Sequence, residues 1–169
     1  RLMDRSSSLM VGLGAAAAAL LFASYVAALD EGARAPALTG RALGTSSNVD
    51  LASHRGSVVV VDFWASWCEP CAEAVPALER IYQRYRGQGL VVIGVSEDNT
   101  EQNARSFLSR ARPTFPIVLD SNRAIANAFR PPTMPTSYIV DRQGVVRHVH
   151  AGYRPGDAAA IERHIRDLL

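Results

Sequence analysis

Cys68 and Cys71, the only two cysteines in the chain, are separated by two residues. Two thiols at this spacing can form a disulfide within one helical turn and exchange it with a second disulfide. They lie where a β-branched run, residues 57–63, gives way to a helical pattern. A helix N-terminus favours the thiolate, because its dipole and free N–H groups stabilise negative charge. The spacing therefore predicts thiol–disulfide exchange, in which Cys68 attacks and Cys71 resolves the mixed disulfide.

Three other uses of a cysteine pair are weaker alternatives. A structural disulfide closing so small a ring contributes only about 2 kcal/mol through loop-closure entropy. Inert thiols are disfavoured by the position between strand and helix, and by the exported setting that the uncharged run at residues 9–29 indicates. Zinc requires two further ligands, for which the chain offers four histidines, His54, His148, His150 and His164. We therefore favour the redox interpretation.

A strand–helix–strand unit positions the cysteine pair. Residues 57–63 (SVVVVDF) and 90–95 (LVVIGV) are runs typical of strands buried on both faces. Apolar residues at helical spacing lie between them, and Gly87 and Gly89 end that helix. The unit is long enough for a right-handed parallel crossover.

The rest of the chain continues this alternation. The predicted elements are helices at about 100–111, 122–129 and 156–169, strands at 116–119, 137–140 and 145–150, and an accessory hairpin within 38–51. Asp-Arg-Gln-Gly between the last two strands indicates a hairpin turn. The pattern predicts a three-layer α/β/α fold around a mixed sheet.

The N-terminal residues indicate export. Residues 9–29 form an uncharged run preceded by two arginines, a layout shared by membrane anchors and cleaved signal peptides. A buried core helix is the other alternative, but the run has no polar face. We expect residues 1–30 to be a signal peptide or anchor, 31–36 a linker, and 37–169 one domain in the periplasm or another extracytoplasmic space.

Composition excludes several classes of function. The 169 residues carry a net charge of +2, too mild for a nucleic-acid-binding surface. The chain has no lysine, so lysine Schiff-base chemistry is impossible. Two cysteines are too few for a disulfide-rich scaffold.

Several motifs together resemble the thioredoxin superfamily. Residues 61–71 (VDFWASWCEPC) resemble its active-site strand and turn, and Pro76 matches the proline that kinks its active-site helix. Met134-Pro135-Thr136 resembles its cis-proline loop, and residues 96–120 resemble the αβ insertion of the TlpA/ResA branch. The resemblance covers about residues 37–169. It implies a thioredoxin-like fold with an extra N-terminal β-hairpin.

The resemblance also implies a substrate-binding surface. Pro135, if cis, lies against the cysteine pair, and the backbone of Met134 hydrogen-bonds an extended substrate; a trans proline in an ordinary turn is the alternative. Trp67 is expected to cover the sulfurs and contact the substrate, while Glu69 opposes thiolate formation at Cys68. The predicted substrate-binding residues are Trp67, Glu69, Pro70, Met134, Pro135 and Thr136.

Asp62 interrupts an otherwise apolar strand. Burial of a carboxylate is costly and raises its pKa. The matching aspartate of thioredoxin exchanges a proton with the second cysteine, so we expect Asp62 to act through a water as general base for Cys71. The alternative is a strand-end aspartate paired with an arginine. Thioredoxin's neighbouring lysine has no counterpart here.

Other polar residues carry weaker signals. Glu97 matches a glutamate of the branch that shapes the substrate groove, although a plain loop acid is an equal alternative. Glu73 is expected on the surface. His148 and His150 share one strand face, which we interpret as a surface face.

The resemblance favours a reductase, because Glu-Pro separates the cysteines as in reducing members. We expect a monomer, without cofactor or metal, that reduces disulfides of exported proteins in cytochrome c maturation or copper-site assembly. A membrane thiol-transfer protein would recharge it. The alternatives are a disulfide oxidase, since direction depends on reduction potential, and a Cu(I)-delivery module using the same thiolates. A peroxiredoxin is disfavoured, because Ala65 occupies the threonine position of its motif.

Overall fold

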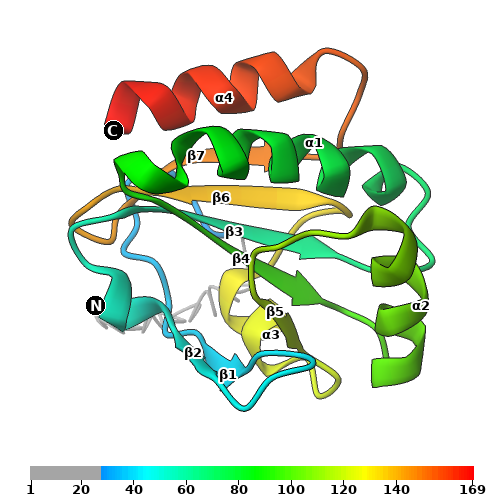
Figure 1. Ribbon diagram of the computed structural model, residues 1–169. Helices are drawn as coiled ribbons and strands as arrows, with labels where there is room; N and C mark the ends of the chain where they lie inside the picture. Colours follow the sequence, from blue (N-terminus) through cyan, green and yellow to red (C-terminus); the bar gives the residue numbers. More distant parts are fainter. Residues whose placement is uncertain (1–27) are drawn as a thin grey trace, which may run out of the picture.

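A five-stranded sheet forms the centre of the computed structural model, which describes residues 28–169 (Figure 1). Its strands are β3 (Val58–Trp64), β4 (Leu90–Ser96), β5 (Ile117–Leu119), β6 (Thr136–Val140) and β7 (Val146–Ala151). They lie in the order β5-β4-β3-β6-β7. The first three pair in parallel, and β6 and β7 continue in antiparallel pairing. The mixed sheet predicted from the sequence is confirmed, with the fully buried β3 at its centre.

Helices cover both faces of this sheet. They are α1 (Cys71–Tyr85), α2 (Glu101–Ala111), α3 (Ala124–Phe129) and α4 (Asp157–Leu168), with short 3₁₀ turns η1 (Leu51–His54) and η2 (Arg86–Gln88). Figure 1 shows α1 and α4 side by side on one face and α3 on the other. Successive β3 residues point to opposite faces, so Val60 packs with α1, α2 and α4, and Val61 packs with α3. This is the three-layer arrangement expected from the sequence.

Two strands outside the main sheet form the expected accessory hairpin. β1 (Thr39–Arg41) and β2 (Asn48–Asp50) pair in antiparallel register. Ala42, just after β1, forms an isolated bridge with Val118 of the edge strand β5. The hairpin therefore covers an edge whose free N–H and C=O groups would otherwise invite pairing with other chains.

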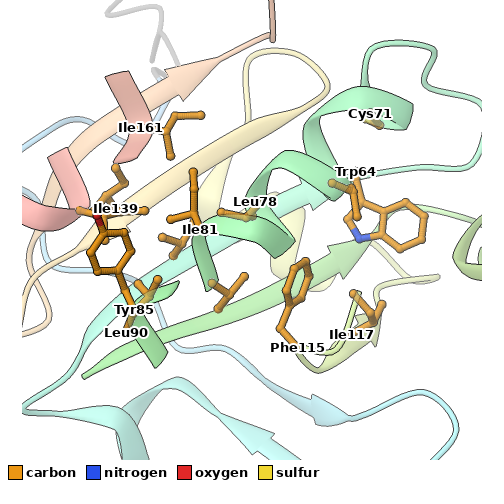
Figure 2. Close-up of a cluster of buried hydrophobic side chains, with 14 of the residues drawn as sticks. Trp64, Cys71, Leu78, Ile81, Tyr85, Leu90, Phe115, Ile117, Ile139 and Ile161 are labelled. Carbon is orange, nitrogen blue, oxygen red and sulfur yellow. The ribbon is translucent and has the colours of Figure 1, made fainter. Parts of the chain in front are cut away.

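The core that supports the cysteine pair lies between the sheet and helices α1, α2 and α4. Figure 2 shows Leu78 and Ile81 of α1 within this cluster, and Phe115 on the same side of it as the indole of Trp64. Trp64 is fully buried and stacks on Phe107, with ring centroids 4.6 Å apart. Each large side chain buried in this way contributes about 1.5–3 kcal/mol to stability. The strand and helix on either side of the cysteines are thus rigidly held.

The segment expected as a linker is ordered against β7. Arg34 forms an antiparallel bridge with Val145, and Gly32 N–H donates to the Val146 carbonyl at 2.7 Å. The outer edge of β7 offers unpaired backbone groups that this segment satisfies, so packing begins before residue 37. Most of the apolar run 9–29 lies outside the described residues. Within residues 28–169, no helix combines the length and hydropathy needed to cross a membrane.

The face of β7 interpreted as open surface is partly covered by α4. The His148 ring stacks on the His164 ring at a centroid distance of 3.7 Å, and His150 Nε2 lies 2.9 Å from His164 Nδ1. His164 carried no signal in the sequence, because only folding brings α4 over β7. Burial, followed by repulsion from the neighbouring imidazoles, lowers the pKa of both His150 and His164.

This histidine cluster predicts acid sensitivity of the fold. A histidine whose folded-state pKa is depressed stabilises the protein above its unfolded pKa of about 6.5 and loses that stabilisation as pH falls towards the folded value. Nearby carboxylates, those of Glu31, Asp157 and Asp167, reduce the shifts but do not reverse them. We expect the cluster to contribute a fall in the free energy of unfolding, measured with urea, between pH 7 and pH 5, superimposed on the opposite contribution of the buried carboxyl groups of Asp62 and Glu97, whose pKa values burial raises to about 7. His164→Gln should reduce that fall, whereas His54→Gln, outside the cluster, should preserve it; equal slopes in all three proteins would contradict this.

Candidate active site

Cys68 and Cys71 are joined by a disulfide at the start of α1, with their Cα atoms 5.4 Å apart. Cys71 is the first residue of the helix, and Pro70 is its N-cap rather than part of its first turn. Cys71 is fully buried, whereas Cys68 retains 6% of its surface. This difference places Cys68 where a substrate sulfur can approach and Cys71 behind it.

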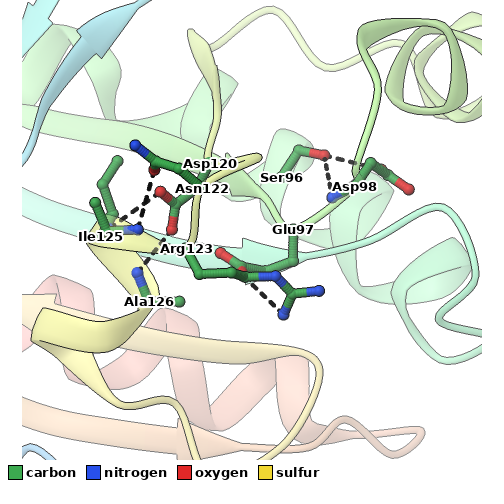
Figure 3. Close-up of polar contacts among 9 residues, drawn as sticks. Ser96, Glu97, Asp98, Asp120, Asn122, Arg123, Ile125 and Ala126 are labelled. Carbon is green, nitrogen blue, oxygen red and sulfur yellow. Dashed lines mark hydrogen bonds and ion pairs between the residues drawn. The ribbon is translucent and has the colours of Figure 1, made fainter.

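Asp98 holds the turn that leads into the cysteine pair. Its carboxylate accepts hydrogen bonds from the Ser66 backbone N–H and from Ser66 Oγ, the latter at 2.5 Å. Ser96 Oγ donates to the other oxygen at 2.8 Å (Figure 3). The turn after β3 is therefore tied to the end of β4. Sequence reasoning missed Asp98, and its one signal is a polar Ser-Glu-Asp run directly after a buried parallel strand.

The loop opposite the cysteines contains a cis peptide bond between Met134 and Pro135. The expectation of a cis proline is confirmed. Met134 contributes to a groove of about 400 Å³, here called the disulfide groove, whose lining residues are Trp67, Cys68, Pro70, Pro131, Thr133 and Met134. Trp67 is 63% exposed, the one large hydrophobic side chain within the described residues that is so open. An exposed indole beside a sulfur suits contact with an apolar polypeptide segment.

The predicted substrate-binding residues are not all in this groove. Trp67, Pro70 and Met134 line it, and Glu69 lies exposed beside it. Thr136 is fully buried in β6, and its hydroxyl donates to the Thr133 carbonyl at 2.8 Å. Thr136 thus fixes the cis-proline loop from within, because it is the first residue to pair with β3.

Asp62 lies in the middle of the buried strand β3 and is almost fully buried. Ser137 Oγ donates to Asp62 Oδ1 at 2.6 Å, while Oδ2 is buried without a hydrogen-bond partner. Burial raises the pKa of Asp62 from 3.8 to about 7, although the Ser137 hydrogen bond opposes this rise. Among the described residues, Asp62 forms no ion pair with an arginine, so the structure does not support the alternative interpretation.

A small cavity adjoins Asp62 beneath the active site. Its lining includes Asp62 and Ser137, Ala74 one turn after Cys71, Pro135 of the cis-proline loop, and Tyr153. Its volume of about 10 Å³ is near the minimum that holds one water molecule. The cavity thus offers room for about one water beside Asp62, although Cys71 is not among its lining residues, and proton exchange between Asp62 and Cys71 stays a prediction.

Glu97 is fully buried, which excludes the plain loop acid among its two interpretations. Its carboxylate lies 3.2 Å from the Arg123 guanidinium (Figure 3), yet neither oxygen forms a hydrogen bond. Burial, together with repulsion from Asp120 and Asp98, raises the pKa of Glu97 to about 7 against the opposing effect of Arg123. Glu73 is exposed, as expected. Within residues 28–169, no cluster of three or more histidine, cysteine or acidic side chains is arranged to hold a metal ion.

A mixed sheet that presents a cysteine pair at a helix N-terminus, opposite a cis-proline loop, defines a thiol–disulfide oxidoreductase of thioredoxin-like fold. Comparison with known proteins agrees with this class. The profile of the AhpC/TSA family matches residues 32–149, and the chain belongs to this family.

The similar proteins bear the names of thiol–disulfide exchange proteins. The thiol-disulfide oxidoreductase ResA of Geobacillus kaustophilus is 30% identical over 118 residues, which are 70% of this chain and 67% of that protein. ResA of Geobacillus thermodenitrificans is 32% identical over 60% of this chain and 59% of its own length. A crystal structure from Chlorobium tepidum, described as a thiol:disulfide interchange protein DsbE, is 33% identical, covers 83% of this chain and 99% of that one, and superposes with a TM-score of 0.79. The chain therefore spans two thirds or less of the two ResA proteins.

Proposed function

We propose that this protein reduces disulfide bonds of other proteins outside the cytoplasm. The observation that carries the proposal is the placement of Cys68 on an open groove beside the cis-proline loop, with Cys71 buried behind it. Such a site admits one substrate sulfur at a time and keeps the second thiol for the resolving step. Glu69 and Pro70 between the cysteines support the reducing direction.

The reaction balances as an exchange of two electrons. In the reduced protein, the Cys68 thiolate attacks one sulfur of a substrate disulfide, and the other substrate sulfur leaves as a thiolate that takes up a proton. Cys71 then loses its proton to Asp62 and attacks the Cys68 sulfur, which releases the second substrate thiol. The substrate disulfide is reduced to two thiols, and Cys68 and Cys71 are oxidised to a disulfide.

Repeated turnover requires a source of electrons. A membrane thiol-transfer protein would supply them by reducing the Cys68–Cys71 disulfide. The apolar run 9–29, acting as a membrane anchor or as an export signal, would bring the domain to the compartment of that protein. As the substrate class we propose disulfides of exported proteins in cytochrome c maturation or copper-site assembly, which the resemblance to the TlpA/ResA branch implies. We propose that the domain acts as a monomer.

The reduction potential of the Cys68–Cys71 couple tests the direction. We expect a potential closer to that of thioredoxin, about −270 mV, than to that of the oxidant DsbA, about −120 mV. Equilibration with glutathione or dithiothreitol would measure it. The reduced protein should also reduce a model disulfide substrate. A potential near the oxidant value would overturn the proposal. Tight Cu(I) binding without disulfide reduction would overturn it in favour of metal delivery.

A further inference from the structure

A second hollow continues the disulfide groove along the surface. This hollow, here called the arginine hollow, has a volume of about 430 Å³ and is lined by residues that include Glu97, Arg123 and Arg130. Pro131 and Met134 line both hollows. A substrate segment lying across Cys68 can therefore extend past the cis-proline loop into the arginine hollow without leaving the surface.

Two arginines flank the short helix α3 at this hollow. Arg123 and Arg130 immediately precede and follow α3, and both adopt left-handed backbone conformations, with φ of 60° and 54°. Residues other than glycine, asparagine and aspartate are uncommon in this region, and glycine usually occupies the position after a helix. Both arginines line the hollow. The chain thus carries long cationic side chains at two backbone positions that ordinarily favour small residues.

The charge that the hollow presents to a substrate is positive. Glu97 is fully buried at its floor, while the side chain of Arg123, 3.2 Å away, is 46% exposed. A cationic substrate residue would have to displace Arg123 in order to reach the Glu97 carboxylate. An anionic residue meets the exposed guanidiniums directly, since Arg130 is exposed as well.

We propose that the arginine hollow binds an acidic side chain of the substrate polypeptide, on the segment flanking the cysteine that Cys68 attacks. This inference rests on the proposed disulfide-reductase function and adds a substrate preference to it. Guanidinium groups bind carboxylates with paired, charge-assisted hydrogen bonds. Glu97 acts as a positioning residue that holds Arg123 at the hollow, and Arg130 is free to turn towards the substrate.

Peptide substrates of defined charge test this preference. Each peptide contains one disulfide, with Glu, Gln or Lys placed at successive positions on either side of the attacked cysteine. At one or more positions on one side, Glu should raise kcat/KM about two- to fivefold over Gln, the range expected for an exposed ion pair, and Lys should lower it. High salt should reduce both effects.

Arg130→Asn is the informative variant, because asparagine tolerates the left-handed backbone and the buried Glu97 keeps its partner Arg123. It should reduce the ratio of kcat/KM for the Glu peptide to that for the Gln peptide, because only Arg123 then remains to meet an anionic residue, and Arg130→Glu should reduce this ratio further. Arg163→Asn, at an exposed position of α4, is the control and should retain the wild-type preference. A preference that is undiminished in Arg130→Asn, or its absence in the wild type, would overturn the inference. Failure of the wild type to reduce even the Gln peptides would instead overturn the proposed function.

Discussion

Replacing Cys71 with serine should convert the protein from a catalyst into a trap for its substrates. Cys68 remains at the edge of the disulfide groove and still attacks a substrate disulfide, but the buried thiol that releases the product is gone. Mixed disulfides should accumulate and appear on non-reducing gels as adducts that dithiothreitol removes. Mass spectrometry of the adducts would identify the substrates. Cys68→Ser should instead lose both the adducts and all disulfide reduction.

The double variant, Cys68→Ser with Cys71→Ser, is the matched control. It retains the groove, Trp67 and the cis-proline loop but has no thiol, so any protein recovered with it is bound without a covalent bond. Adducts that form more readily with Cys68→Ser than with Cys71→Ser would mean that the buried cysteine attacks. That result would contradict the roles that exposure assigns to the two thiols.

The parts of the fold that sequence could predict are those set by local pattern. The apolar run of β3, the helical spacing within α1 and the turn before β7 each identify an element from neighbouring residues alone. The cysteine pair and the cis-proline loop were predictable because their motifs are short and specific. Each of these predictions fits the structure to within a residue or two.

The missed features all depend on contacts between distant segments. Asp98 holds the Ser66 turn only because the carboxyl ends of the parallel strands β3 and β4 lie side by side. The burial of Glu97 depends on α3 and Arg123, which come later in the chain. Thr136 follows the cis-proline in sequence, yet strand pairing turns its side chain inward. No local pattern carries this information.

Asp62→Asn should slow disulfide reduction, with a loss of about a hundredfold at neutral pH, towards the lower end of the usual contribution of a general base. The wild-type rate should rise as Asp62 ionises around its pKa of about 7, and the variant should lose that rise. Ser137→Ala should move the rise to higher pH, because the hydrogen bond that lowers the pKa of Asp62 is removed. Stopped-flow Trp fluorescence across pH 5 to 9 would measure these profiles. Asp167→Asn, at an exposed position of α4, is the control.

Asp62→Asn should raise the stability of the folded protein at high pH although it lowers the activity. A carboxyl group whose pKa rises from 3.8 to about 7 on folding binds its proton more tightly in the folded state, so stability falls as pH rises between those values. Asp62→Asn should remove this fall and stabilise the oxidised protein at pH 8 by as much as about 4 kcal/mol. A variant that loses activity without gaining stability at high pH would show that Asp62 does not carry a buried charge. If Asp62→Asn changes neither activity nor stability at high pH, Asp62 has no part in the mechanism. Burial makes the Asp62 charge costly and also brings the pKa of Asp62 into the range of proton exchange, so the two effects should appear together.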